Sequence, residues 1–195
     1  RGRYEKSNTE LFKKIIKPGM IIVDVGAHVG YFTRLFSRLA KPIGRVYAFE
    51  ADPSNFALLK KNTEHCGNIV IHQMAISDHV GNIDFFHSEL KTGCHSTIPS
   101  SMRQTKLTVL AFTLDELMQK ENIKQVDIIK MDIEGGEVAA LRGMVQTIAA
   151  NPALQLITEF NPECFVEANI EPLAFLRQLA ENGFKIYAIR PSGQL

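Results

Sequence analysis

The apolar positions of the chain fall into short continuous runs that predict buried strands. The run 20–25 is mostly apolar and β-branched, and it lacks the alternation of a strand with one wet face. Such runs are typical of parallel strands that are covered on both faces. On this basis we predict parallel strands at 20–25, 45–49, 69–76, 127–132, 154–160 and 184–189, and two further strands, 81–86 and 107–112, where the periodicity changes.

Segments with helical periodicity and helix-start signals separate these strands. Ser7 with Glu10 and Thr113 with Glu116 have the spacing of capping boxes, and Asp52 is a typical N-cap. The alternation of strands and helices predicts an α/β fold, namely a Rossmann-like, doubly wound and mostly parallel sheet with helices on both faces. We predict helices at 7–17, 31–40, 52–66, 113–121 and 172–182, and one after Gly136 in which Val138, Leu141, Val145 and Ile148 share a face.

Polar residues dominate the stretch 88–106, which separates the two strands inserted after the third parallel strand. A polar segment of this length in a compact domain is usually a lid, a substrate-binding segment or an unstructured loop, and the sequence leaves these alternatives open. The chain has 195 residues, of which 45% are hydrophobic and 22% charged. This composition suits one well-packed unit, so we expect a single domain over 1–195 with a polar insertion at 88–106.

Charge and cysteine content narrow the function classes. A formal net charge of +1 gives no strong field for a polyanion, which favours a small molecule over nucleic acid as the partner. Cys66, Cys94 and Cys164 are too few and scattered for a disulfide framework or a zinc module. No apolar run is long enough to span a membrane. We therefore expect reduced thiols, a cytoplasmic location and no membrane partner, and the oligomeric state stays open. The chain begins at Arg1 without a methionine, so it could be trimmed from a longer protein.

The first predicted strand runs into a glycine loop with the chemistry of a nucleoside site. Gly26 and Gly30 lie where a chain that leaves a strand needs positive φ or close backbone approach. A dinucleotide fingerprint needs a second glycine where this chain has His28, and Asp24 would repel a phosphate but attract a sulfonium or an ammonium. S-adenosylmethionine carries both cations and no phosphate, so it fits better than a nicotinamide or flavin dinucleotide. A tight turn without any ligand is the alternative.

Acidic residues end four of the predicted parallel strands. Glu50 ends the second strand, about 20 residues after the glycine loop, where an acid grips ribose hydroxyls. Asp52 already serves as the helix cap, which leaves Glu50 free for a ribose. Because the carboxyl ends of parallel strands meet at one edge of a sheet, we expect four acids to converge there: Asp24, Glu50, Asp132 and Glu159.

Four segments, 23–33, 47–53, 112–117 and 128–135, resemble the FkbM-type S-adenosylmethionine-dependent methyltransferases. The resemblance covers nearly the whole chain in the right order, and the last two segments are its more specific part. It implies O-methylation of a hydroxyl on a sugar or a polyketide-like natural product. The related superfamily usually ends with a further antiparallel strand, and we expect that strand to be truncated from the given sequence rather than replaced by a new topology. The candidate cofactor contacts are Asp24, Gly26, Ala27, His28, Gly30, Glu50, Ala51, Asp52, Asn55 and Ala75.

Three acids, Asp132, Glu134 and Glu159, are the candidate catalytic bases, with His95 as an outside alternative. Methyl transfer from a sulfonium needs alignment of the acceptor and removal of its proton. Each acid has another role open to it: Asp132 could hold the amino group of the cofactor, Glu134 could cap a helix, and Glu159 could pair with an arginine. The three acids could instead bind Mg²⁺, although no specific metal motif is present.

Three other functions remain open from the sequence. A nucleotide-dependent oxidoreductase would need the missing second glycine. A methyltransferase acting on nucleic-acid bases would carry an aromatic residue after a Pro-Pro turn, where this chain has the segment 132–135. A non-catalytic S-adenosylmethionine-binding protein would have the same cofactor residues as the enzyme.

Overall fold

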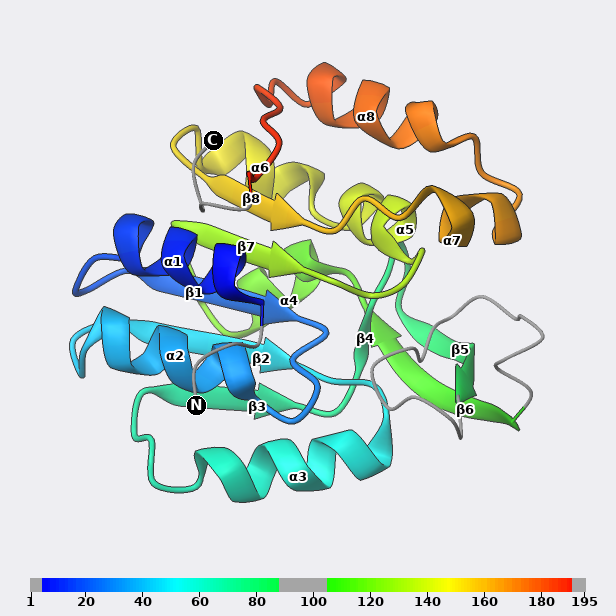
Figure 1. Cartoon of the computed structure of the whole chain (residues 1–195). Helices are drawn as coiled ribbons and strands as arrows, with labels where there is room; N and C mark the ends of the chain where they lie inside the picture. The colour runs from blue at the N-terminus through cyan, green and yellow to red at the C-terminus, as the bar shows by residue number, and fades with distance from the viewer. Residues whose placement is uncertain (1–4, 88–104, 191–195) are drawn as a thin grey trace.

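A five-stranded parallel sheet forms the centre of the protein (Figure 1). The structure is a computed structural model, and it describes residues 5–87 and 105–190. The strand order is β3-β2-β1-β7-β8, so the chain reverses its direction of winding between β1 and β7, as in doubly wound sheets. The strands are β1 (Ile21–Val25), β2 (Arg45–Phe49), β3 (Ile69–His72), β7 (Ile128–Met131) and β8 (Gln155–Thr158).

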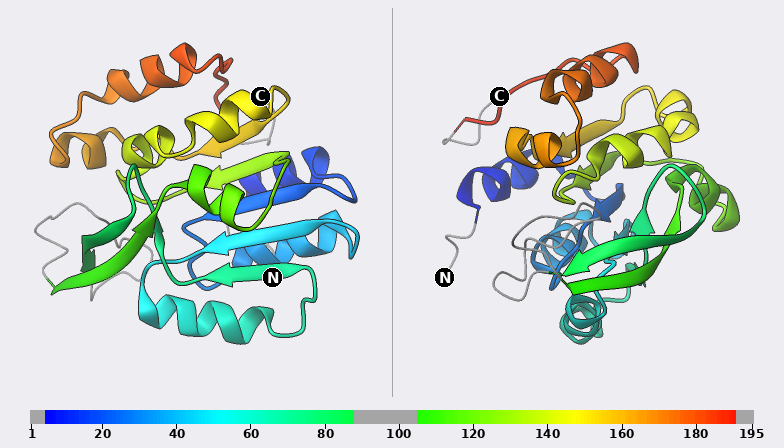
Figure 2. Two further views of the ribbon diagram at one scale, coloured as in Figure 1. Left: turned by 180° about the vertical axis from the view of Figure 1, so that it is seen from behind. Right: turned by 90° about the vertical axis from the view of Figure 1, so that its right-hand side faces the viewer.

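Helices cover both faces of this sheet, which confirms the predicted fold class (Figures 1 and 2). Ile22 and Ile128 point to the face where α1 (Lys6–Ile15) and α2 (Tyr31–Ala40) pack, and α3 (Pro53–Thr63) adjoins α2. Val23 and Ile129 point to the opposite face, because successive strand residues alternate between faces. That second face is covered by α4 (Leu114–Lys120), α5 (Glu137–Arg142), α6 (Val145–Ala150), α7 (Pro162–Glu167) and α8 (Pro172–Glu181).

A separate three-stranded sheet stands beyond the carboxyl ends of the main strands (Figure 1). It contains β4 (Ala75–Ile76), β5 (Gly81–His87) and β6 (Thr105–Phe112) in the order β4-β6-β5. The single strand predicted at 69–76 is therefore wrong, because the chain leaves the main sheet after His72 and pairs Ala75 with Ala111 in the small sheet. Most of the predicted insertion 88–106 lies outside the described residues, and its last two residues belong to β6.

The amphipathic helix predicted after Gly136 is two helices. Gly143 interrupts it, and a Cβ at this position would lie 1.9 Å from the carbonyl oxygen of Ser77, so the backbones meet there too closely for a side chain. After the break Met144 is fully buried, whereas Val145 is 49% exposed. The break at Gly143 thus places Met144 in the core instead of Val145, which the helical periodicity indicates.

The predicted helix starts were right at two positions and wrong at one. The Thr113 side chain accepts a hydrogen bond from the backbone N–H of Glu116 (3.1 Å), and Asp52 caps α3 by accepting from two backbone N–H groups. The first helix instead begins at Lys6 with Glu5 in the N-cap position, and Glu10 pairs with Lys13 at 2.8 Å. The capping box predicted at the start of that helix is therefore wrong.

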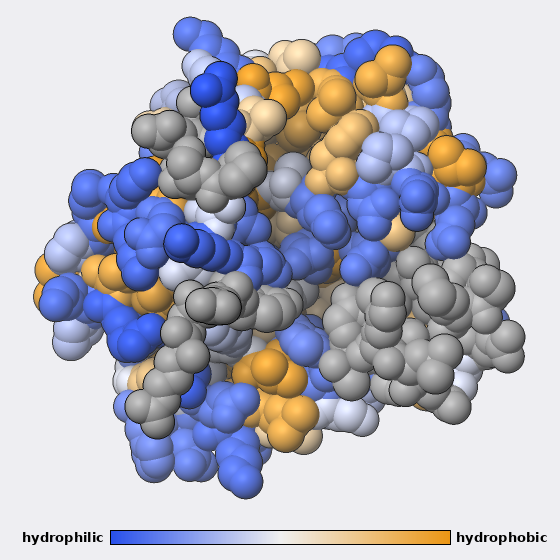
Figure 3. Space-filling view, viewed as in Figure 1, coloured by the Kyte–Doolittle hydropathy of each residue, from blue (hydrophilic) through white to orange (hydrophobic). Residues whose placement is uncertain are grey.

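The strand predicted at 184–189 is also wrong, because residues 184–190 belong to no helix or strand. This segment, β8 and α8 line an apolar groove, and Ile186 and Tyr187 are 50% and 62% exposed. Apolar side chains gather on the same side of the molecular surface, at the top of the space-filling view (Figure 3). The helix α7 was not predicted. Among the described residues, no helix combines the length and the apolar character that crossing a bilayer requires.

Candidate active site

A cavity lies at the carboxyl ends of β1, β2 and β7, between the main sheet and the small sheet. This is the switch point of the strand order, where doubly wound folds bind their ligands. The cavity takes its walls from the loop after β1, from the end of β2 and the start of α3, from β4 and β5, and from the loop after β7. Its polar or loop residues include Gly26, His28, Glu50, Asn55, Ser77, Lys130, Asp132 and Glu134.

The glycine loop after β1 is packed directly against the loop after β7. Gly26 has a φ of +75°, and a Cβ on it would lie 2.0 Å from the carbonyl oxygen of Asp132. No other residue fits this position, because it combines a left-handed backbone with a close approach of two main chains. His28 also has a positive φ, of 52°, and it lines the cavity. The two loops therefore form one continuous floor beneath any bound ligand.

Glu50 is a buried carboxylate held by two backbone groups. Its Oε2 accepts a hydrogen bond from the N–H of His28 at 2.7 Å, and its Oε1 accepts one from the N–H of Asp52 at 2.8 Å. Burial raises the pKa of Glu50 to about 7, although the two backbone N–H groups favour its charged form. An ionised carboxylate has about four acceptor positions, so each oxygen keeps one for a ligand.

Asp24 lies beneath the glycine loop and is fully buried. Its Oδ2 accepts a hydrogen bond from the Thr33 hydroxyl at 2.6 Å, and its Oδ1 is 3.6 Å from the ammonium of Lys130. Burial raises the pKa of Asp24, while Lys130 and Thr33 oppose this shift. In the structure Asp24 does not line the cavity formed by the described residues, so its charge faces a lysine of the protein itself.

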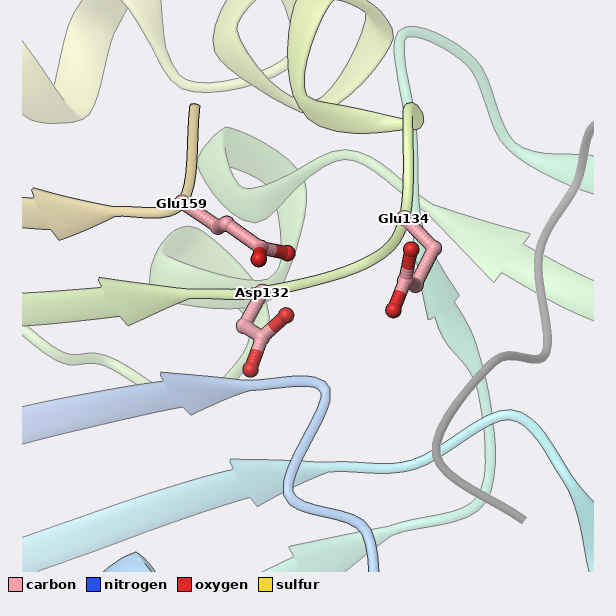
Figure 4. A group of neighbouring side chains, drawn as sticks. All are labelled: Asp132, Glu134 and Glu159. Atoms are coloured by element: carbon pink, nitrogen blue, oxygen red, sulfur yellow. The ribbon is translucent and has the colours of Figure 1, made fainter. Parts of the chain in front are cut away.

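Three carboxylates meet at the ends of β7 and β8 (Figure 4). Asp132 and Glu134 follow β7, Glu159 follows β8, and one oxygen from each lies within 4.8 Å of the others. Burial, together with the charges of Asp132 and Glu134, raises the pKa of Glu159 to about 7. Such a cluster can accept a proton near neutral pH, and its oxygen ligands would also suit a hard cation.

Two residues that sequence reasoning missed hold the loop after β7. Glu137 is buried, and its carboxylate accepts hydrogen bonds from the N–H groups of Ile133 (3.0 Å) and Gly135 (2.7 Å). The buried Cys164 thiol donates to the Glu134 carboxylate at 3.3 Å. The acid in the first turn of α5 was the available signal for Glu137. The role of Cys164 depends on its contact with Glu134, which lies 30 residues away in the chain and which no short sequence pattern indicates.

The structure brings most of the predicted cofactor residues to the cavity. Gly30 and Asp52, like Asp24, are not among the described residues that line it: Gly30 is the N-cap of α2, and Asp52 caps α3. Glu159 adjoins the cavity through the acid cluster, and His95 lies outside the described residues. Lys130 was not predicted, although it is a charged residue within an apolar strand. The predicted cofactor residues that line the cavity are Gly26, Ala27, His28, Glu50, Ala51, Asn55 and Ala75.

Comparison with known proteins points to one family. The family model for the methyltransferase FkbM domain matches residues 24–186. The chain is 25% identical over 203 residues to the 2-O-methyltransferase NoeI of Sinorhizobium fredii, a match that covers 96% of this chain and 82% of that protein. It is 26% identical over 163 residues to the hexuronic acid methyltransferase AglP of Haloferax volcanii, which covers 83% of this chain and 62% of that protein.

A solved structure supports the fold. Fibrillarin of Aeropyrum pernix, solved with natively bound S-adenosyl-L-methionine, superimposes with a TM-score of 0.57 at 15% sequence identity. The superposition covers 96% of this chain and 70% of that chain. At this identity the likeness concerns the fold of the sheet and its helices.

Proposed function

The chain belongs to the FkbM family of methyltransferases, and on that premise we propose that it transfers a methyl group to a hydroxyl oxygen of a small molecule, namely a sugar or a natural product. S-adenosylmethionine is the cofactor of this family. The observation that carries the proposal is the cavity at the switch point of the sheet, with a ribose-type acid on one side and three carboxylates on the other. The family match favours this function over the oxidoreductase alternative.

The residues of the first half of the cavity fit the proposed cofactor. Glu50 keeps one acceptor position on each oxygen, which suits the two hydroxyls of a ribose. Phe49, Met74 and Ala75 give the cavity an apolar wall for a nucleobase. His28 stands where a dinucleotide site would need a glycine. Bound here, S-adenosylmethionine supplies a methyl group that its sulfonium already activates.

The second half of the cavity has the groups for proton removal. We assign the role of base to Asp132, because it both lines the cavity and belongs to the acid cluster. Glu159 and Glu134 lie beside it and support this role, because neighbouring carboxylates can share or accept the proton that Asp132 removes. Glu137 keeps the loop that carries Asp132 and Glu134 in place through its two backbone hydrogen bonds.

The acceptor class is inferred from relatives. NoeI is named a 2-O-methyltransferase and AglP a hexuronic acid methyltransferase, so sugars are the first compounds to test. The chain spans 82% of NoeI but only 62% of AglP, so the activity of either whole protein is a proposal for this chain.

The direct test is transfer of labelled methyl from S-adenosylmethionine to simple methyl glycosides. Neutral glycosides and a matched glucuronide should be assayed side by side, and the products treated with mild alkali. We expect alkali-stable label, because an ether formed at a hydroxyl survives hydrolysis whereas an ester formed at a carboxylate does not. Alkali-labile label on the glucuronide alone would show that the acceptor is a carboxylate. Binding of the cofactor without transfer to any glycoside would favour the non-catalytic alternative.

A further inference from the structure

Lys130 connects the two halves of the cavity, and the roles given above account only for its contact with Asp24. It lies in β7 opposite Asp24 of β1 in the parallel register, and only 9% of its side chain is exposed. Its ammonium donates a hydrogen bond to the carbonyl oxygen of Gly26 at 2.9 Å. The same nitrogen is 3.6 Å from Oδ1 of Asp24 and 3.5 Å from Oδ2 of Asp132. It also lies 5.8 Å from the centre of the Phe32 ring.

The surroundings keep this buried lysine charged. Burial disfavours the ammonium, but Asp24, Asp132 and Glu5 outweigh it and raise the pKa of Lys130. The two nearer acids differ in exposure, because Asp24 is fully buried whereas the Asp132 side chain is 36% exposed. Lys130 therefore stands between a fully buried carboxyl group and a carboxylate that faces the cavity.

A counterion that served Asp24 alone would not need the other two contacts. The hydrogen bond to Gly26 fixes the glycine loop that follows β1. The ion pair with Asp132 fixes the first residue of the loop that follows β7. The backbones of these two loops already touch at Gly26 and Asp132. Lys130 is thus placed to set how the two loops lie relative to each other.

We propose that Lys130 is a positioning residue, which holds the glycine loop at Gly26 and the carboxylate of Asp132 in a fixed arrangement relative to each other. The inference rests on the proposed function, because it assumes that the two loops bind cofactor and acceptor. It predicts that removal of Lys130 weakens cofactor binding and slows turnover even when the buried charge of Asp24 has been removed as well.

The test compares two variants in which Asp24 is already neutral. Lys130→Met alone would leave Asp24 as an unpaired buried anion and destabilise the fold for that reason only. Asp24→Asn keeps an oxygen for the Thr33 hydroxyl and serves as the reference. Asp24→Asn/Lys130→Met removes both members of the pair. Calorimetry with S-adenosylhomocysteine, thermal unfolding and methyl transfer to the glycoside acceptor should be measured for both variants and for the unaltered protein.

We expect the double variant to unfold at a temperature close to that of Asp24→Asn but to bind S-adenosylhomocysteine about tenfold more weakly, the usual size for loss of a hydrogen bond from a charged donor. Its kcat should fall more than its KM for the acceptor rises. In Asp24→Asn/Lys130→Gln the amide still offers a donor to Gly26, so part of the affinity should return. This variant also provides the comparison if the methionine variant does not fold.

Two results would overturn the inference, and only the second would also overturn the proposed function. Equal affinities and equal kcat values for Asp24→Asn and the double variant would show that Lys130 is only the counterion of Asp24, and the proposed function would stand. Failure of the unaltered protein to bind S-adenosylhomocysteine would overturn the proposed function and the role of Lys130 together.

Discussion

The two halves of the cavity hold their carboxylates in opposite ways. Glu50, in the cofactor half, is buried and accepts two backbone hydrogen bonds, so the main chain fixes its position. Asp132, Glu134 and Glu159, in the acid half, face one another and are more exposed. A single carboxylate with fixed donors suits recognition, whereas three carboxylates that repel one another suit a group whose protonation changes during the reaction.

The largest expected effect concerns the acid half. Asp132→Asn keeps the shape of the side chain but removes its charge, so turnover should fall by about a hundredfold or more, the usual size of a general-base contribution. Affinity for S-adenosylhomocysteine should change much less, because Glu50 and the glycine loop are untouched. Turnover with several substrate concentrations and calorimetry measure the two quantities separately.

Glu159→Gln is the matched control for Asp132→Asn. If Glu159→Gln abolishes turnover while Asp132→Asn retains it, the base is at the end of β8 and our assignment is wrong. A chelator should leave turnover unchanged. Loss of turnover with a chelator and its return with Mg²⁺ would identify the three acids as cation ligands.

The second effect concerns the cofactor half. Glu50→Ala removes the acceptor of the ribose hydroxyls, and this should weaken cofactor binding by about 1.5 to 3 kcal/mol. Calorimetry with S-adenosylmethionine measures this loss, and circular dichroism checks that the variant is folded. NAD should bind neither the unaltered protein nor Glu50→Ala, because His28 replaces the glycine that a pyrophosphate needs. An unchanged dissociation constant in a folded Glu50 variant would remove this residue from the site.

The third expected effect is the pH dependence of cofactor affinity. Ribose hydroxyls donate to the charged form of Glu50, whose pKa is about 7 without ligand, so binding should release a proton below this pH. Affinity should rise with pH up to about 7 and then level off, with a change of about tenfold over one pH unit on the acidic side. Calorimetry in buffers of different ionisation enthalpy measures the proton release. Glu50→Gln should abolish the pH dependence, whereas Glu159→Gln should retain it.

The same shift in the pKa of Glu50 acts on folding with the opposite dependence. The folded protein holds this proton more tightly than the unfolded chain, so the free energy of unfolding should decrease as the pH rises from about 4.5 to about 7. Urea unfolding across this range should show a shallower decrease for Glu50→Gln than for the unaltered protein.

The sequence predicted the cofactor half more completely than the acid half. The glycine loop, Glu50 and the helix cap at Asp52 lie close together in the chain, and their contacts follow from local turn and cap chemistry. The partner of Asp24 could not be predicted in this way, because Lys130 is brought opposite it only by the pairing of β1 with β7. From the sequence, Asp24 was therefore assigned to a cationic ligand, whereas in the structure it lies beside the ammonium of Lys130.

The errors in the fold have the same origin. The apolar run 69–76 has no internal signal for a change of sheet, which occurs because Ala75 pairs with Ala111. The helical periodicity after Gly136 does not reveal that Gly143 must pass close to Ser77. Residues 184–189 are as apolar as a strand, but composition does not show whether a neighbouring strand is available to pair with them.

The sequence of the small sheet, which forms one wall of the cavity, can change independently of the five-stranded parallel sheet. In the described part of the chain, β4, β5 and β6 form a hydrogen-bonded ladder of their own, while Phe85 and Ser77 face the cavity. Substitutions in β5 and β6 leave the register of β1, β2 and β7 unchanged, because no ladder pairs these strands with the small sheet there. Evolution can therefore vary this wall of the cavity while the parallel sheet that carries Glu50, Asp132 and Glu159 at its strand ends keeps its register.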